Sequence, residues 1–130
     1  MGNLIIPDSL LREANATREL QNCVHRKEHR EPFVVDGVVV GFYTPHQTRL
    51  KWRWATKHDW PYAWELGPAY VQPAYRRRGL LLSIFNLYWD RPMIGFSADD
   101  NEASIGIHKA AGFHRWKRHR TGYFYARDAR

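Results

Sequence analysis

The segment Phe33–Val40, Phe-Val-Val-Asp-Gly-Val-Val-Val, is the strongest local constraint on how this chain can fold. Asp36 and Gly37 are suited to the two positive-φ positions of a tight two-residue turn, and β-branched residues flank them on both sides. This pattern predicts an antiparallel hairpin, and Pro45 is expected to close its second strand.

The other hydrophobic patterns predict helices and strands in an order typical of one α/β domain that spans residues 1–130 and contains a mixed sheet. A helix is expected from about residue 9 to 25, with Asp8 or Ser9 as its cap. Gly67-Pro68 should interrupt a strand as a bulge or a splayed edge, because proline removes a ladder donor. The remaining predicted strands are 49–54, 63–66, 69–71, 93–97, 113–117 and 123–126, and the remaining predicted helices are 80–89 and 102–111, with Gly112 after the last.

The composition excludes several classes of protein. Aromatic residues make up 15% of the 130 residues, far too many for a disordered chain, and the length allows one hydrophobic core. The single Cys23 excludes a disulfide framework and a cysteine-based zinc site. His25 and His29 share a helix spacing but have no third ligand nearby, so no metal is expected. No apolar run could span a membrane and no signal peptide is visible, so we expect a cytoplasmic protein.

The formal net charge is +7, and it is unevenly distributed. Residues 1–65 carry 9 basic and 8 acidic side chains, whereas residues 66–130 carry 11 and 5, a net charge of +6. This asymmetry indicates an anionic partner that meets the second half, although basic residues also serve solubility alone.

Three arginines and a glycine, Arg76-Arg77-Arg78-Gly79, lie between a predicted strand and a predicted helix. The first backbone N–H groups of a helix lack intrahelical partners, and the helix dipole adds positive potential there. Gly79 allows a ligand to approach the backbone closely. The pattern therefore favours a phosphate cradle about as strongly as the alternative, a basic loop before a core helix.

Two motifs resemble the GNAT superfamily of N-acetyltransferases, over about residues 33–126. Val71–Gly79, Val-Gln-Pro-Ala-Tyr-Arg-Arg-Arg-Gly, is similar to the acetyl-CoA pyrophosphate loop of that family, with Leu81 where a small residue is usual. Asn101–Phe113 is similar to the family pattern Asn-x-x-Ala-x-x-Leu-Tyr-x-x-x-Gly-Phe, with His108 in place of the tyrosine. The resemblance implies a mixed, mostly antiparallel sheet with flanking helices and a splayed strand pair at the cofactor site.

The resemblance also implies a ternary mechanism in which acetyl-CoA, without a metal, is the acyl donor to an amine. The main chain near Ala69, Tyr70 and Val71 would bind the pantetheine arm and polarise the thioester carbonyl. Asn101 would bind the cofactor arm. The pyrophosphate would be held by the loop and the first turn of the helix, through Arg76, Arg77, Arg78, Gly79, Leu80 and Leu81.

His108 is the candidate acid for the leaving thiolate, since it takes the place of the family's tyrosine and histidine titrates near neutral pH. Its alternative role is packing on a helix flank. Glu65 is the candidate base for the acceptor amine, and it could equally pair with a neighbouring arginine. Trp60 and Tyr62 are candidate substrate-binding residues, placed to stack on a ring or a base.

A second class of function remains open on the sequence alone. Arg115, Lys117, Arg118 and Arg120 form a basic run that the cofactor does not require. A nucleic-acid-binding or nucleic-acid-modifying protein on a GNAT scaffold, such as the phage DNA-modification proteins of the Mom type, is therefore the alternative. The acceptor and the oligomeric state remain open.

Overall fold

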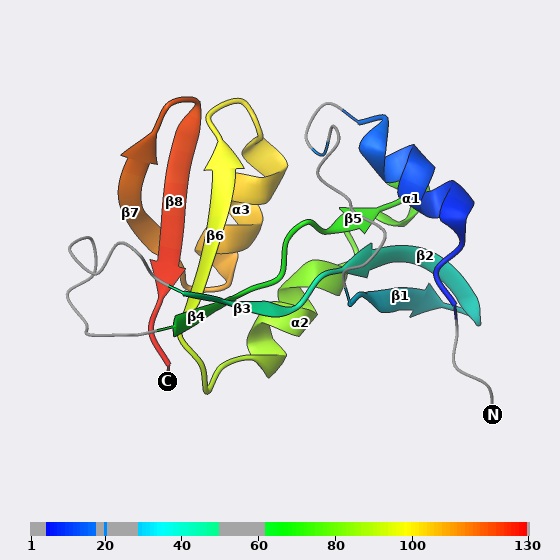
Figure 1. Ribbon diagram of the computed structural model, residues 1–130, viewed down its shortest axis with the longest axis horizontal. Helices are drawn as coiled ribbons and strands as arrows, with labels where there is room; N and C mark the ends of the chain where they lie inside the picture. The colour runs from blue at the N-terminus through cyan, green and yellow to red at the C-terminus, as the bar shows by residue number, and fades with distance from the viewer. Residues whose placement is uncertain (1–4, 18–19, 21–28, 50–61, 130) are drawn as a thin grey trace. The chain divides into compact units, whose positions relative to one another are not determined.

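The computed structural model describes residues 5–17, 20, 29–49 and 62–129 of the chain (Figure 1). The chain divides into two compact units, Met1–Pro45 with Leu66–Leu80 and His46–Glu65 with Leu81–Arg130. Each unit contains one sheet, and the two sheets are antiparallel apart from one parallel strand pair. The expectation that residues 1–130 form a single domain stays a prediction.

The first unit has a three-stranded antiparallel sheet in the order β1-β2-β5. Its strands are β1 (Glu31–Val35), β2 (Val38–Tyr43) and β5 (Tyr70–Val71). The predicted hairpin is confirmed, because Asp36 and Gly37 join β1 to β2 with φ of 50° and 79°.

Helix α1 (Asp8–Asn15) covers this sheet through Leu10 and Ala14, which are buried with Phe42 and Tyr70. Helix α1 ends at Asn15, and residues 18, 19 and 21–25 of the predicted helix lie outside the described residues. Ala16 and Thr17 form a turn in which the Thr17 hydroxyl donates to the Ala14 carbonyl at 2.7 Å and accepts from the Leu20 N–H at 3.3 Å. A threonine side chain that bonds to the backbone in this way competes with continued helix, which explains the early end.

The second unit has a five-stranded sheet in the order β3-β4-β6-β8-β7. The strands are β3 (His46–Arg49), β4 (Tyr62–Glu65), β6 (Met93–Ala98), β7 (His114–His119) and β8 (Gly122–Arg127). Among the described strands of this sheet, only β4 and β6 are parallel, where Trp64 is opposite Met93. The sheet is therefore mixed, as expected. Most of the predicted strand 49–54 lies outside the described residues.

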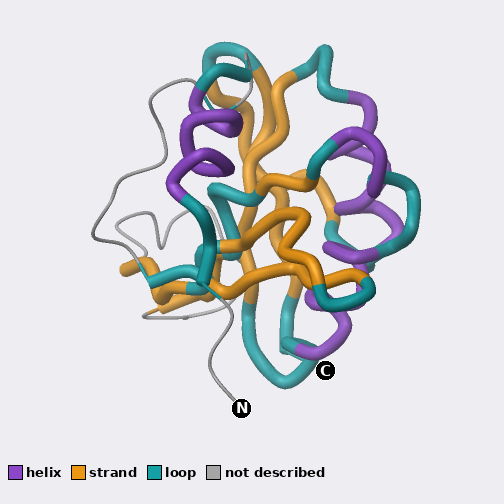
Figure 2. Tube along the Cα trace, turned by 90° about the vertical axis from the view of Figure 1, so that its right-hand side faces the viewer, coloured by secondary structure: helices purple, strands orange, loops and turns teal. Residues whose placement is uncertain are grey.

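Two helices pack on the same side of this sheet, α2 (Leu80–Leu87) and α3 (Glu102–Ala110) (Figure 2). Phe85 of α2 contacts the rings of His108 and Phe113, with centroids 5.5 and 5.0 Å away. Helix α2 ends two residues earlier than predicted, in a turn that follows Leu87. Gly112 follows α3 with φ of 88°, as expected for a C-terminal glycine.

The predicted strand at 63–71 is divided at Gly67-Pro68, where the peptide bond is cis. Its first part, β4, pairs with β3 and β6, whereas its second part, β5, pairs with β2 in the other sheet. Thr44 holds the segment between them, since its N–H donates to the Leu66 carbonyl and its hydroxyl to the Pro68 carbonyl. The predicted interruption at Gly67-Pro68 is therefore confirmed, because the two parts of the strand belong to different sheets.

Candidate functional site

The loop that follows β5 has a backbone suited to binding an anion. Gln72 donates its N–H to the Val40 carbonyl at 2.8 Å, and a short 3-10 turn, η2 (Pro73–Tyr75), comes next. Arg77 and Gly79 then adopt positive φ, 65° and 72°, immediately before α2 begins at Leu80. Left-handed residues are a feature of backbone anion nests, in which successive N–H groups turn to one side.

The arginine side chains of this loop are anchored on neighbouring aromatic rings. The Arg76 Nε donates to the Val71 carbonyl at 2.8 Å, and its guanidinium lies 5.6 Å from the Tyr70 ring centre. The Arg78 guanidinium lies 5.1 Å from the ring centre of Tyr75. These contacts hold two cations at the loop.

A side-chain network that the sequence reasoning missed joins β5 to α1. The buried Tyr70 hydroxyl donates to Glu13 Oε2 at 2.6 Å, and Gln72 Nε2 donates to the other Glu13 oxygen at 3.4 Å. Burial, with the adjacent Glu13 carboxylate, raises the pKa of Tyr70 to about 12. Tyr70 is therefore a fixed neutral donor, and its side chain braces the strand whose main chain is the candidate pantetheine-binding segment.

In the second unit, Asn101 caps helix α3. Its Oδ1 accepts a hydrogen bond from the Ser104 N–H at 3.2 Å. The cap uses the side-chain oxygen of Asn101, so the side-chain amide nitrogen is the group that would bind the cofactor arm. That role stays a prediction.

His108 lies inside a box of aromatic rings and is only 6% exposed. Its ring stacks on Tyr125 at 5.2 Å with an angle of 6°, and Phe113 meets it edge-on at 5.0 Å. Nδ1 is 2.9 Å from the Ser97 hydroxyl, while Nε2 lies so close to Gly95 that any Cβ there would collide with it.

The environment of His108 strongly disfavours its charged form. Burial lowers the pKa of His108 to about 4, and a hydrogen bond with the Ser104 backbone offsets only part of this effect. The imidazole is consequently neutral at pH 7. Packing on the helix flank, the alternative reading of the sequence, describes its contacts well, and its part in catalysis stays a prediction.

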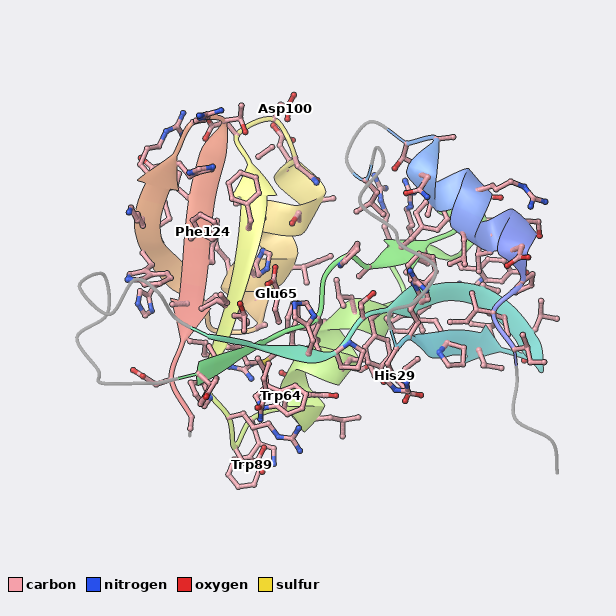
Figure 3. The ribbon with its side chains drawn as sticks, viewed as in Figure 1. His29, Trp64, Glu65, Trp89, Asp100 and Phe124 are labelled. Atoms are coloured by element: carbon pink, nitrogen blue, oxygen red, sulfur yellow. The ribbon has the colours of Figure 1, made fainter. Side chains whose placement is uncertain are left out.

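Glu65, the candidate base, pairs with a histidine that the sequence reasoning did not select. His46 and Glu65 are opposite each other on β3 and β4, with 3.4 Å between His46 Nε2 and Glu65 Oε2. Both side chains are partly exposed, and Figure 3 shows Glu65. The signal that could have found His46 is its position just after Pro45, where the chain must begin a new strand.

Of the two candidate substrate-binding residues, Tyr62 is among the described residues and Trp60 is not. Tyr62 begins β4 and is 49% exposed, so it is available to a ligand. Trp60 lies outside the described residues. In the described part of the chain no hydrogen bond or ion pair joins Glu65 to His108, so the structure brings Glu65 together with His46 instead.

Comparison with known proteins gives the fold. No family model matches the sequence, and no curated protein matches it either. Among solved structures, the crystal structure of an N-acetyltransferase from Staphylococcus aureus Mu50 matches with a TM-score of 0.55 over 93% of this chain and 81% of that chain. The fold is GNAT-like. Identity over this GNAT-like fold is 16%, so the likeness concerns architecture.

The described residues lack a metal-binding cluster and a membrane-spanning helix. Those residues contain no group of three or more histidine, cysteine, aspartate or glutamate side chains placed to hold a metal ion. Within the same part of the chain, no helix is long and apolar enough to cross a membrane. His25, one of the two histidines with helical spacing, lies outside the described residues.

Proposed function

We propose that the chain is an acetyl-CoA-dependent N-acetyltransferase acting on an amine in a ternary complex. The observation that carries this proposal is the backbone from Arg76 to Leu80, where positive φ at Arg77 and Gly79 directly precedes the first turn of α2. A nest of N–H groups at a helix N-terminus suits the two phosphates of a pyrophosphate. The GNAT-like fold supports the same assignment.

Each part of the loop has a proposed role when acetyl-CoA, the source of the thioester, is bound. The pyrophosphate accepts hydrogen bonds from main-chain N–H groups of Arg77, Arg78, Gly79, Leu80 and Leu81. Arg76 and Arg78 add positive charge from their anchored positions. Main-chain groups of Ala69, Tyr70 and Val71 orient the pantetheine arm and polarise the thioester carbonyl. Asn101 supplies a further donor to the cofactor arm.

The proposed base is the Glu65 carboxylate acting with the His46 imidazole. The amine gives its proton to this pair, the C–N bond forms, and the C–S bond breaks to release the thiolate of CoA. His108, neutral at pH 7, is proposed to donate a hydrogen bond toward the departing sulfur. Water supplies the proton that the thiolate takes up, and the pair returns its proton to solvent. Tyr62 and Trp60 are proposed to contact the acceptor.

The first experiment measures acetyl-CoA binding by calorimetry. Gly79→Ala places a side chain at a φ that L-residues rarely adopt, although open space surrounds it, so the nest should distort and affinity should fall at least about tenfold. Gly37→Ala is the matched control, because Gly37 also has a positive φ and open surroundings but lies in the hairpin turn. Absence of binding by the wild-type protein would overturn the proposal, as would equal losses in the two variants.

The second experiment tests the proposed base by following thiol release from acetyl-CoA with a panel of primary amines. Glu65→Gln and His46→Asn should each lower turnover about a hundredfold while acetyl-CoA affinity stays unchanged. Glu31→Gln is the control, because His29 and Glu31 form another imidazole–carboxylate pair, at 2.7 Å, in the first unit. Turnover unaffected by Glu65→Gln would remove Glu65 and His46 from the mechanism.

A further inference from the structure

The sheet of the second unit has two unlike faces at its β6-β8-β7 end. One face meets α3, because Tyr125 stacks on His108 and the Ser97 hydroxyl is 2.6 Å from that of Ser104. Successive side chains of a strand point to opposite faces, so Phe96 and Phe124 lie on the other one. Both helices of this unit, α2 and α3, lie on the first face (Figures 1 and 2).

The face opposite α3 has a cluster of four aromatic side chains, which we call the aromatic platform. Its members are Phe96, Trp116, His119 and Phe124. Phe96 and Phe124 are a cross-strand pair with ring centres 5.3 Å apart, and both lie within about 6 Å of the His119 ring. Phe96 is 36% exposed and His119 is exposed, while Phe124 is labelled in Figure 3. The platform therefore presents ring surface to a ligand.

The charged side chains of the three strands that carry the platform are all basic. Strands β6, β7 and β8 contain no aspartate or glutamate. Lys117 lies opposite Phe124 in the register and so shares the platform face. Strand β7 is at the edge of the sheet and also carries Arg115 and Arg118, whose guanidinium groups lie about 5 Å from the Tyr123 ring on the other face. Lys117 is therefore a cation on the platform face, whereas Arg118 on the other face pairs with Asp99 at 2.6 Å.

We propose that the aromatic platform binds single-stranded nucleic acid, DNA or RNA. Base faces would stack on Phe96 and His119, and Lys117 would contact a phosphate of the same strand. Rings that lie open beside cations are the arrangement by which proteins hold unpaired bases without reading their sequence, and the bases of a duplex cannot offer their faces in this way. The charge complementarity between strands whose charged side chains are all basic and a polyanion selects this partner. The proposal goes beyond acetyl transfer and does not depend on it.

The test is fluorescence anisotropy with labelled oligothymidine and oligouridine of about 12 nucleotides, and with a duplex of equal length, at salt concentrations from about 50 to 200 mM. The wild-type chain should bind the single strands more tightly than the duplex. Phe96→Leu keeps an apolar side chain but removes the ring face, and it should weaken binding about tenfold. Phe96→Tyr should restore it. The ranking of the two strands shows which of these DNA and RNA probes binds more tightly.

The cationic contribution is tested with two variants of equal charge change. Lys117→Glu should weaken binding and lower the slope of log affinity against log salt by about 0.7 or more. Lys109→Glu is the control, because Lys109 is exposed on α3 and so belongs to the other face. Wild-type affinity for Phe96→Leu, equal losses in the two lysine variants, or equal affinity for duplex would overturn the proposal.

Discussion

A single histidine makes the interior of the second unit sensitive to acid. His108 occupies the position at which the GNAT pattern has a tyrosine, and it fills a box made by Phe85, Phe113 and Tyr125. The absence of a side chain at Gly95 makes room for the ring. The imidazole of His108 is consequently neutral, and protonating it in the folded chain lowers the free energy of unfolding.

This effect predicts a loss of stability between pH 6.5 and pH 4. The pKa of His108 falls from its ordinary 6.5 to about 4 in the folded chain, so over this window the unfolded chain binds the extra proton. The free energy of unfolding should therefore decrease as the pH falls, by about 3 kcal/mol in total. Urea unfolding at a series of pH values measures it.

The variant His108→Leu should flatten that part of the pH dependence, whereas His114→Leu, which changes an exposed histidine on β7, should retain it. An unchanged slope in His108→Leu would show that another group carries the acid sensitivity.

At the scale of elements, a buried arginine connects the ends of two helices. Arg127 on β8 is 3% exposed, and its guanidinium donates to the carbonyls of Phe85 and Tyr88 at the end of α2 and of Ala111 at the end of α3. It also lies 5.2 Å from the ring centre of Phe113. A cation at two helix C-termini meets the negative ends of both dipoles. It also adds hydrogen bonds to the carbonyls of Phe85 and Tyr88, which each accept one main-chain N–H as well.

Replacing Arg127 should therefore destabilise the fold more than replacing an exposed arginine. Arg127→Met removes the charged hydrogen bonds to three carbonyls and the cation at two helix ends, and it should cost about 2–4 kcal/mol of the free energy of unfolding. Arg120→Met, in the exposed turn between β7 and β8, should change it by about 0.5 kcal/mol or less. Denaturant unfolding of both variants makes the comparison. Similar midpoints for the two variants would contradict the capping role.

The elements that could be predicted from the sequence are those specified by local chemistry. The Asp36-Gly37 turn, the break at Pro68 and the helix end at Gly112 each depend on the backbone preferences of one or two residues. Strand β3 starts at His46, earlier than the predicted strand 49–54. Residues His46–Arg49 are a strand because they pair with β4, and a search for alternating apolar residues does not detect that pairing. The early end of α1 depends on side-chain bonds of Thr17, which periodicity does not encode.

The candidate site was predictable to a similar degree. The motif around Arg76 and Gly79 lies in one continuous segment, so its position next to a helix start could be read from the sequence. The partners of Glu65 and His108 come from other strands and helices. Burial and pairing of that kind arise only after folding, and for this reason the neutral state of His108 and the selection of His46 could not be predicted.

At the scale of the whole molecule, the net charge of +7 destabilises the folded chain through repulsion between like charges. Compact folding brings like charges together, and added salt screens them, since the Debye length falls from about 30 Å at 0.01 M to about 8 Å at 0.15 M. We therefore expect the melting temperature to rise by a few degrees over this range of sodium chloride. Lys109→Glu lowers the net charge from +7 to +5, by two units, and should show a smaller rise. Thermal unfolding followed by circular dichroism measures both, and a melting temperature that falls with salt would mean that attractive pairs such as Arg118 with Asp99, at 2.6 Å, outweigh the repulsion.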